Sequence, residues 1–501
     1  MSHQLKIFHL LILLFIISVI AIWSSQLFTE WDVDYGVYYV GSNFLDDNFQ
    51  LYKDFFTHKG PLYYLFLKTI GYFIGWGKWQ AYFSIILTMF VFYIPIFFIL
   101  LFERVSLSKF TLGILLSVCL LYNQNTNSCI SFFQSGFLIT SFWLLIKRDE
   151  IFTLNVSFFL LVCAILSRID GIIYLPVYLF ILFYGNHFNN FKDYFKILFT
   201  WSIILSVSFF TLMFIFDFNF NQYYINNFKF NNWYKNAIVA DSNLFYQIAK
   251  YIVRPSSYDI LTGSILIIPL LIIFPKLFSN FKEINLIIKN IFRKSKITNS
   301  ISSNTRAILI LILSFIGWFL TISDKDYHFI MVLLPILIVI FLNLNSLNFK
   351  QCILVIVISL YCILTITYLP IHKLLKDPEC LFSVHCKGSY LSEYSESINF
   401  MKEITDNEIA IVGHVPWVYF FSGKRPKGSL NNYWFYFLEK PFVSEILLKE
   451  HKDLLKMPKG KIFLIENKFL DLNFRNKFMQ EILANSLLLD RLDKFSIHQI
   501  R

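Results

Sequence analysis

The chain has 501 residues, of which 56% are apolar and only 15% are charged. This composition excludes an ordinary soluble protein, in which about 45–50% of residues are apolar and about 25% are charged. The net charge of +11 does not indicate nucleic-acid binding, because Lys and Arg cluster at the ends of apolar runs and in one loop, as membrane topology requires. We therefore expect a polytopic α-helical membrane protein, with the lipid bilayer and no nucleic acid among its partners.

Apolar runs of about 20 residues, enough to cross roughly 30 Å of hydrocarbon, recur along most of the chain. We predict eleven spans, at 7–23, 80–102, 109–124, 130–147, 152–167, 171–185, 196–217, 260–280, 307–323, 328–345 and 350–370. The first run lacks a small-residue cleavage site, so we expect a retained anchor rather than a signal peptide. The shorter run from Pro61 to Gly75 contains Lys68 and predicts an interfacial or re-entrant helix. If that run crosses, the count becomes twelve and every later loop changes side.

Basic residues in short loops prefer the cytoplasm, and this preference orients the chain. With eleven spans, the cytoplasmic loops contain Arg104, Lys109, Lys147, Arg148, Lys192, Lys196, the basic loop from Lys276 to Arg306, and Lys350. The N-terminus is then cytoplasmic, and the first loop, 24–79, and the C-terminal segment are periplasmic or extracellular. Residue usage typical of a low-GC genome and the absence of eukaryotic targeting signals favour a bacterial inner membrane.

The first loop opens with Asp32 and Asp34, immediately outside the membrane. After them, apolar residues recur at helical spacing, at Val37, Val40, Gly41, Phe44 and Leu45, with Ser42, Asn43, Asp46 and Asp47 on the opposite face. A helix with this pattern lies on a membrane surface rather than crossing it. Further on, His58 and Lys59 precede Pro61, a residue that suits the first turn of a helix. The loop therefore offers carboxylates at one end and cations at the other.

Three motifs in this loop carry a resemblance to a known family. They are Asp34-Tyr35-Gly36-Val37-Tyr38, Tyr52-Lys53-Asp54 and Lys59-Gly60-Pro61-Leu62-Tyr63-Tyr64. Their order and spacing resemble those of polytopic GT-C glycosyltransferases that use polyprenyl-phosphate sugars, among them bacterial relatives of the protein O-mannosyltransferases and the lipid A aminoarabinose transferase. The resemblance implies an enzyme that moves a hexose or pentose from a polyprenyl-phosphate donor to a hydroxyl group, with inversion. It also marks Tyr52, Asp54 and Tyr63 as loop-motif residues.

This transfer requires a base for the acceptor proton and positive charge for the departing phosphate. Many relatives have Asp-Glu where this chain has Asp34-Tyr35, so either Asp34, which we favour, or Asp32 is the base. The alternative for both acids is a helix N-cap. Lys59 is the leading phosphate ligand, with His58 beside it; the alternatives are a snorkelling lysine and a structural histidine.

Two further outer positions match the family pattern. Arg168 precedes Asp170-Gly171 and interrupts an apolar stretch, where a charge requires a partner or a role. It either contacts the donor phosphate or forms a structural bridge with Asp170. Lys325, Tyr327 and His328 open the tenth span and resemble a motif before a Pro-containing helix. We expect Lys325 or His328 near the phosphate, the alternative being ordinary loop residues.

No organic cofactor is expected. Asp32 and Asp34 resemble the acidic pairs that bind a divalent metal with nucleotide sugars, since hard cations take oxygen ligands. Protein O-mannosyltransferase-like relatives suggest that the metal is unnecessary, whereas oligosaccharyltransferase-like relatives use one. We do not favour a metal.

After residue 370 the composition becomes that of a small soluble α/β domain. We predict two domains: 1–370, the transmembrane transferase domain, and 371–501, a periplasmic α/β domain. Within the second, the segment from Ile409 to Phe421 opens with the apolar run IAIV before Gly413 and predicts a buried strand with its exit turn. A second strand is expected at 461–465, and helices at roughly 390–405, 441–457 and 473–486. Cys380 and Cys386 are its only cysteines, and an oxidising compartment predicts a disulfide between them; two free thiols are the alternative.

Other functions remain open at this stage. A flippase or transporter for a lipid-linked sugar explains the spans and Arg168, but no internal repeat is visible. A surface-polysaccharide polymerase or ligase uses lipid-linked glycans without an acid-rich first loop. A membrane anchor for the C-terminal domain does not need eleven spans. The acceptor can be a glycan, a lipid or a protein.

Overall fold

A computed structural model describes residues 33–45, 49–54, 56–122, 129–147, 150–185, 191–233, 302–321, 330–361, 392–413, 415–427, 452–467 and 477–501, together with positions 12 and 470. The chain divides into two compact units. The helical unit comprises Met1–Ala21, Ile85–Phe210 and Ser242–Leu369. The loop-sheet unit comprises Ile22–Ser84, Thr211–Asp241 and Pro370–Arg501. Each unit is described by itself below.

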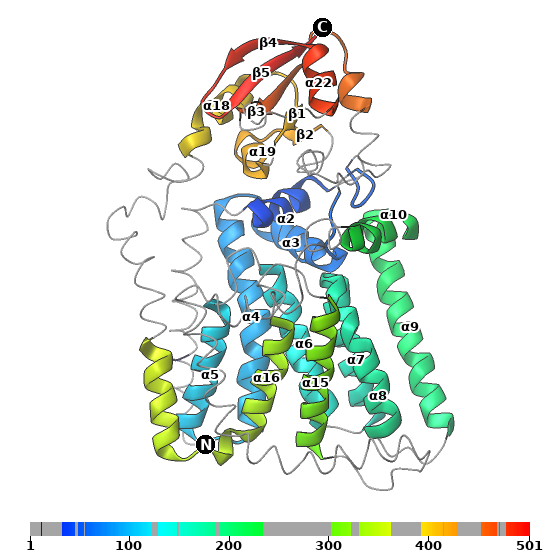
Figure 1. The fold of residues 1–501 in the computed structure, drawn as a ribbon, viewed down its shortest axis with the longest axis vertical. Helices are drawn as coiled ribbons and strands as arrows, with labels where there is room; N and C mark the ends of the chain where they lie inside the picture. The colour runs from blue at the N-terminus through cyan, green and yellow to red at the C-terminus, as the bar shows by residue number, and fades with distance from the viewer. Residues whose placement is uncertain are drawn as a thin grey trace. The chain divides into compact units, whose positions relative to one another are not determined.

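The helical unit is built from the long apolar runs. Its helices are α4 (Lys78–Phe102), α5 (Leu107–Tyr122), α6 (Cys129–Lys147), α7 (Ile151–Ser167), η2 (Ile169–Tyr174), α8 (Leu175–Gly185), α9 (Phe191–Phe216), α15 (Ser303–Thr321), α16 (Ile330–Asn343) and η5 (Leu344–Ser346), with the ends of α4 and α9 belonging to the other unit. Helix α6 packs against α7, α15 and α16 (Figure 1). Gly136 permits close approach of α4, because a Cβ there would lie 2.1 Å from the carbonyl oxygen of Val91.

Three described helices are long and apolar enough to cross a membrane, namely Trp79–Phe102, Ile130–Lys147 and Lys192–Phe216. Shorter apolar helices lie at Leu107–Ser117, Ile151–Ser167, Ile169–Phe183, Ser303–Ser314, Leu334–Ser346 and Phe349–Tyr361. Helices therefore lie in the described parts of the predicted spans from 80–102 to 196–217 and of those beyond residue 300. The predicted spans at 7–23, apart from position 12, and at 260–280 lie outside the described residues. The count of eleven stays a prediction.

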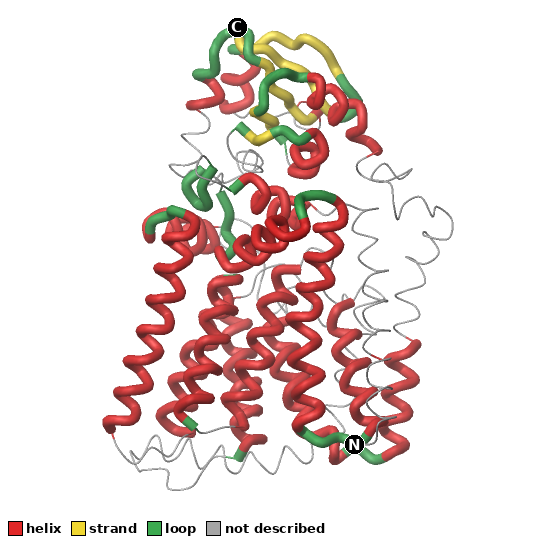
Figure 2. The backbone as a smooth tube through the Cα atoms, turned by 180° about the vertical axis from the view of Figure 1, so that it is seen from behind, coloured by secondary structure: helices red, strands yellow, loops and turns green. Residues whose placement is uncertain are grey.

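The loop-sheet unit combines three segments that are distant in the sequence. From the first loop come α2 (Val33–Phe44) and α3 (Pro61–Ile74), and after α9 come α10 (Phe220–Tyr224) and the π-helix η3 (Ile225–Lys229). The C-terminal segment adds η7 (Ser392–Tyr394), α18 (Ser395–Glu403), β1 (Glu408–Val412), α19 (Pro416–Ser422), β2 (Arg425–Pro426), β3 (Ile462–Glu466), α22 (Lys477–Ala484), β4 (Ser486–Arg491) and β5 (Phe495–Ile500). Figure 2 shows these strands gathered in one sheet.

The sheet has the strand order β2-β1-β3-β5-β4. Strand β1 runs parallel to β2 and β3, whereas β5 runs antiparallel to both β3 and β4. One apolar cluster contains Ala410, Val412, Phe463, Ile465 and Ile500 from the strands, Leu454, Met457, Met479 and Ile482 beside them, and Phe56 and Phe230 from the other two segments. All three segments of the unit therefore share one hydrophobic core.

The surface-helix prediction is correct about the helix and wrong about its polar face. Helix α2 forms where the spacing predicts it, but Ser42 is fully buried and donates to the carbonyl of Tyr38 at 2.7 Å. The cause is tertiary packing: α2 packs against both α3 and α19, and Ser42 is buried while Asn43 is half-buried. Asp46 and Asp47 lie outside the described residues.

The C-terminal segment is also only partly as predicted. Strands β1 and β3 and helices α18 and α22 lie where the sequence predicts them. The strand β1 ends at Val412, however, and the residues from Pro416 onward form helix α19 rather than an exit turn. The hairpin of β4 and β5 is not predicted at all, and it completes the sheet. Most of the predicted helix at 441–457 lies outside the described residues.

His498 is buried on β5, with 4% of its surface exposed. Its Nε2 lies 2.9 Å from Ser496 Oγ and its Nδ1 lies 3.3 Å from Ser486 Oγ, and its ring faces Phe463. Burial, with the charge of Arg491 as a smaller cause, lowers the pKa of His498 from 6.5 to about 4. The folded sheet therefore holds the neutral imidazole.

This burial predicts a loss of stability in mild acid. Below pH 6.5 the unfolded chain binds a proton at His498 that the folded chain refuses until about pH 4. The contribution is complete above pH 6.5 and falls by roughly 1.4 kcal/mol per pH unit below it. We expect the melting temperature of the full chain in detergent to drop between about pH 6.5 and pH 5, and to drop less in His498→Gln. Equal losses in both proteins would contradict this assignment.

Candidate active-site loop

The turn at Tyr52 folds the first loop back on itself. Tyr52 has a φ of 65°, a left-handed conformation that is rare for a bulky residue, and its side chain is fully buried. Its hydroxyl donates to the carbonyl oxygen of Lys59, and its ring packs edge-on against Phe218 and Tyr223. Burial raises the pKa of Tyr52 well above its ordinary value, which keeps the hydroxyl protonated as a donor. The loop is thereby closed from residue 52 to residue 59.

Lys59 is held immediately before α3. Its backbone N–H donates to Thr57 Oγ1 at 3.3 Å, and the hydroxyl of Tyr64 donates to the same oxygen at 2.9 Å. The Lys59 side chain is only 7% exposed. A lysine is rarely buried to this degree unless its charge interacts with an opposite one. Because α3 begins at Pro61, the N-terminal end of this helix follows Lys59 directly, and helix N-termini attract anions.

His58 joins this loop to the core of the unit. Its ring lies 5.1 Å from that of Phe230, and Phe56 packs edge-on against the same ring at 5.0 Å. Phe56 and Phe230 both belong to the apolar cluster that contains the strands of the sheet. His58 and Lys59 therefore lie on a loop that packs against the core of the C-terminal sheet.

The other predicted motif residues of the first loop have structural contacts in the same unit. Asp54 Oδ2 accepts the backbone N–H of Gln50 at 3.2 Å, which closes the turn locally. Tyr63 is fully buried on α3, with its ring edge-on to Tyr38 of α2 at 5.9 Å. Tyr63 thus contributes to the packing of α2 on α3.

Asp34 lies in the first turn of α2, in the same compact unit as Lys59 and His58. Asp32, the second candidate base, lies outside the described residues, as do Lys325, Tyr327, His328, Cys380 and Cys386. The roles of these residues, the disulfide and the metal at Asp32 and Asp34 stay predictions. In the part of the chain that the structure describes, no group of three or more His, Cys, Asp or Glu residues is placed to hold a metal ion.

Arg168 lies in the helical unit, at the C-terminal end of α7. It is 4% exposed, its Nη2 lies 2.6 Å from Asp170 Oδ2, and its Nη1 donates to Ser131. Gln134 Nε2 also donates to Asp170 Oδ1, at 2.9 Å. This ion pair is the structural bridge that sequence reasoning left open as one alternative for Arg168. The donor role of Arg168 stays a prediction.

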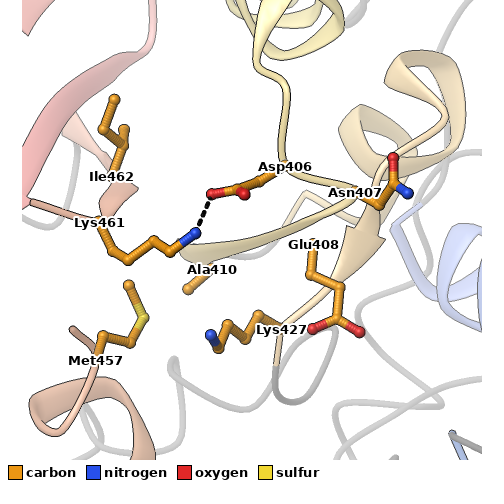
Figure 3. A pocket seen from close by; sticks show the side chains of 8 residues that line it. All are labelled: Asp406, Asn407, Glu408, Ala410, Lys427, Met457, Lys461 and Ile462. Carbon is orange, nitrogen blue, oxygen red and sulfur yellow. Dashed lines mark hydrogen bonds and ion pairs between the residues drawn. The ribbon is translucent and has the colours of Figure 1, made fainter.

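A separate pocket of about 280 Å³ lies at one edge of the C-terminal sheet (Figure 3). It is lined by Asp406, Asn407, Glu408, Ala410, Lys427, Met457, Lys461 and Ile462. Lys461 Nζ lies 2.7 Å from Asp406 Oδ2, and this hydrogen bond and the charges of Lys461 and Lys427 lower the pKa of Asp406. The pocket carries two lysines and two acids, so its charge favours neither anions nor cations.

Sequence reasoning missed the residues that hold the loop in place. Thr57, Tyr64 and Asn226 all contact it, and Asn226 Nδ2 donates to the carbonyl of Tyr52 at 3.4 Å. Tyr64 belongs to the third loop motif, so the sequence did single out the segment that contains it. Asn226 comes from a segment more than 150 residues away, rich in Asn and aromatic residues, and nothing in its local pattern marks it.

Comparison of the chain with known proteins and solved structures shows its fold. No protein-family model matches the chain, and no curated protein matches its sequence. The structure is similar to the crystal structure of ArnT from Cupriavidus metallidurans bound to undecaprenyl phosphate, with a TM-score of 0.57 at 13% identity, covering 98% of this chain and 97% of that chain. The chain has the GT-C fold.

A second structure of ArnT from the same organism, in the apo state, has a TM-score of 0.52 at 12% identity and covers 93% of each chain. An oligosaccharyltransferase from Archaeoglobus fulgidus has a TM-score of 0.46 at 12% identity, covering 93% of this chain and 70% of that chain. With identities this low, the property shared with ArnT is the fold. The GT-C resemblance predicted from the loop motifs is confirmed at that level.

The closure of the loop is tested by removing one hydroxyl group. Tyr52→Phe keeps the ring contacts with Phe218 and Tyr223 and leaves the buried carbonyl of Lys59 without its donor. An unsatisfied buried acceptor costs about 1–3 kcal/mol, so we expect a lower melting temperature for the full chain in detergent. Tyr72→Phe, at a position that is 84% exposed, is the matched control. Identical melting of Tyr52→Phe and wild type would show that this hydrogen bond does not hold the loop.

Proposed function

We propose that the chain is an integral-membrane glycosyltransferase that moves a sugar from a polyprenyl-phosphate donor to a hydroxyl group on the outer face of the membrane. The observation that carries this proposal is the GT-C fold over 98% of the chain, shared with an ArnT structure bound to undecaprenyl phosphate. The buried Lys59 before the first turn of α3 supports it independently, because it offers positive charge where the motifs predict a phosphate. The proposal includes eleven spans, a cytoplasmic N-terminus and a periplasmic C-terminal domain in a bacterial inner membrane.

The reaction is a direct displacement at the anomeric carbon. Asp34 removes the proton from the acceptor hydroxyl, and the resulting oxygen nucleophile forms a bond to that carbon. The bond between the anomeric carbon and the phosphate oxygen breaks, and its electron pair leaves with the polyprenyl phosphate. Attack from the face opposite the leaving group inverts the anomeric configuration. Asp32 is the second candidate for the base.

Stabilisation of the leaving phosphate is the task of Lys59. Its ammonium group and the first-turn N–H groups of α3 lie on one short stretch of chain, and both favour negative charge. Because a phosphate is already a weak base, its departure requires no general acid. His58, on the same stretch, is a second candidate phosphate ligand. Arg168, Lys325 and His328 are further candidates from other loops.

The test is transfer of radiolabelled sugar from a panel of polyprenyl-phosphate donors in membranes that contain the wild type, Asp34→Asn or Lys59→Ala at equal expression. We expect Asp34→Asn to lower kcat by about 10²–10⁴-fold, because it removes the general base. We expect Lys59→Ala to lower kcat by about 10²–10³-fold, because it removes charge stabilisation from the leaving group.

Lys53→Ala is the matched control, since Lys53 is an exposed lysine on the same loop. It should transfer sugar at the wild-type rate. If the wild type consumes no donor, the proposal is overturned. If Asp34→Asn is fully active and Asp32→Asn is inactive, Asp32 is the base instead. Movement of labelled lipid across the membrane without sugar transfer would instead favour a flippase.

A further inference from the structure

Helix α19 of the C-terminal segment presses against the helix that carries Asp34. A Cβ built on Gly36 would lie 2.5 Å from Nε1 and 2.8 Å from Cε2 of Trp417, and 2.9 Å from Cγ of Pro416. Real Cβ atoms do not approach other atoms so closely, so only glycine fits at position 36 while Trp417 keeps its place. Trp417 itself is 2% exposed and is among the largest buried side chains of the described chain.

Trp417 is held firmly by the sheet. Within α19, the hydroxyl of Tyr419 accepts the backbone N–H of Ile411, a residue of β1, at 2.9 Å. Tyr419 is 2% exposed, so this bond is shielded from water. The helix begins at Pro416 and stops at Gly423, whose φ of 70° is the left-handed conformation suited to a helix end. Strand β1 therefore determines where α19 lies.

Helix α2 receives this contact on one side and is braced on others. Tyr39, one turn after Gly36, lies 5.8 Å from Trp417 and 5.1 Å from Phe420, ring to ring, and donates to the carbonyl of Gly77 at 2.7 Å. Tyr38 packs edge-on against Tyr63 and Tyr64 of α3. Asp34 lies two residues before Gly36 on the same helix, so a displacement of the backbone at position 36 also moves position 34.

We propose that Trp417 is a positioning residue for the transfer reaction, which acts through Gly36 to set the place of the first turn of α2 and of Asp34. This inference rests on the proposed function. The soluble C-terminal domain then determines the rate of the chemical step, in addition to any contact with the acceptor. A misplacement of about 1 Å in a catalytic group can cost 10²-fold in rate, so a crowded Cβ at position 36 is sufficient to slow transfer.

The experiment measures kcat and KM for the donor in purified full-length protein. Gly36→Ala should lower kcat by about 10-fold or more and leave KM nearly unchanged, because α2 shifts while the Lys59 loop does not. Trp417→Phe shortens the ring that faces Gly36 and should stay within a few-fold of wild type. The double variant Gly36→Ala/Trp417→Phe should recover part of the lost kcat, because the smaller ring relieves the two shortest contacts of the new methyl group and leaves only the one with Pro416 Cγ.

A control variant separates positioning from a general loosening of the domain. Ile497→Val removes one methylene group from a buried position of β5, outside the apolar cluster that contains Phe56 and Phe230, at a cost of about 0.5–1.5 kcal/mol. It should lower the melting temperature and leave kcat unchanged. Equal loss of kcat in Ile497→Val and Gly36→Ala would show that domain stability alone sets the rate, and would overturn the inference.

Two other outcomes also decide the inference. If Gly36→Ala transfers sugar at the wild-type kcat, or if Trp417→Phe fails to restore the double variant, Trp417 does not position α2. Both outcomes are measured against a wild type that transfers sugar, so neither contradicts the proposed function. An inactive wild type with every donor overturns the proposed function and, with it, the positioning role.

Discussion

The hydrogen bond from Tyr52 to the backbone of Lys59 is the interaction on which closure of the candidate active-site loop depends. Loops normally run over the surface because their backbone polar groups need water. Here Leu51 and Tyr52 of the turn and the stretch from Phe56 to Gly60 are buried, apart from the half-buried His58, so their backbone groups need partners within the protein. The Tyr52 hydroxyl donates to the carbonyl of Lys59, and Thr57 Oγ1 accepts the Lys59 N–H. The hydroxyl of Tyr64 donates to the same Thr57 oxygen. The hydrogen bonds that allow the loop to be buried therefore also fix the backbone of Lys59.

The division of the chain into units follows from the same packing. Phe56 of the first loop and Phe230 of the segment after α9 enter the apolar cluster of the C-terminal sheet. A second contact, between Trp417 and Gly36, joins the sheet to α2. Both ends of the candidate active-site loop are thus packed against the C-terminal segment. We infer that this segment supports the candidate active-site loop.

Local patterns in the sequence predicted the features that depend on local physics. Runs of apolar residues placed the long helices, Pro61 marked the start of α3, and the IAIV run before Gly413 marked β1. The GT-C resemblance came from three short motifs in one loop. Features set by distant partners were not predictable. Ser42 has a polar side chain but is fully buried, and the ring of Tyr52, at the left-handed turn, packs against aromatic rings from beyond residue 215.

The missed hairpin has a similar explanation. The run Leu487–Leu489 continues the apolar pattern of the preceding helix, and its side chains are exposed in β4, so no alternation of buried and exposed residues marks a strand. Its strand conformation comes from pairing with β5, whose Ser496 and His498 are buried, the latter beside Phe463. Arg168 was ambiguous for a different reason. Its spacing to Asp170 is equally suited to an internal ion pair and to an anion site, and the structure contains the ion pair.

The most direct measurement is a cryo-electron microscopy structure of the full chain with undecaprenyl phosphate bound. The account predicts that the phosphate group lies within hydrogen-bonding distance of the Lys59 ammonium group, beside the first turn of α3. It also predicts that Asp34 faces the open space next to that phosphate, where the sugar of a complete donor would stand. A phosphate bound elsewhere on the chain, with Lys59 making only protein contacts, would contradict the central claim.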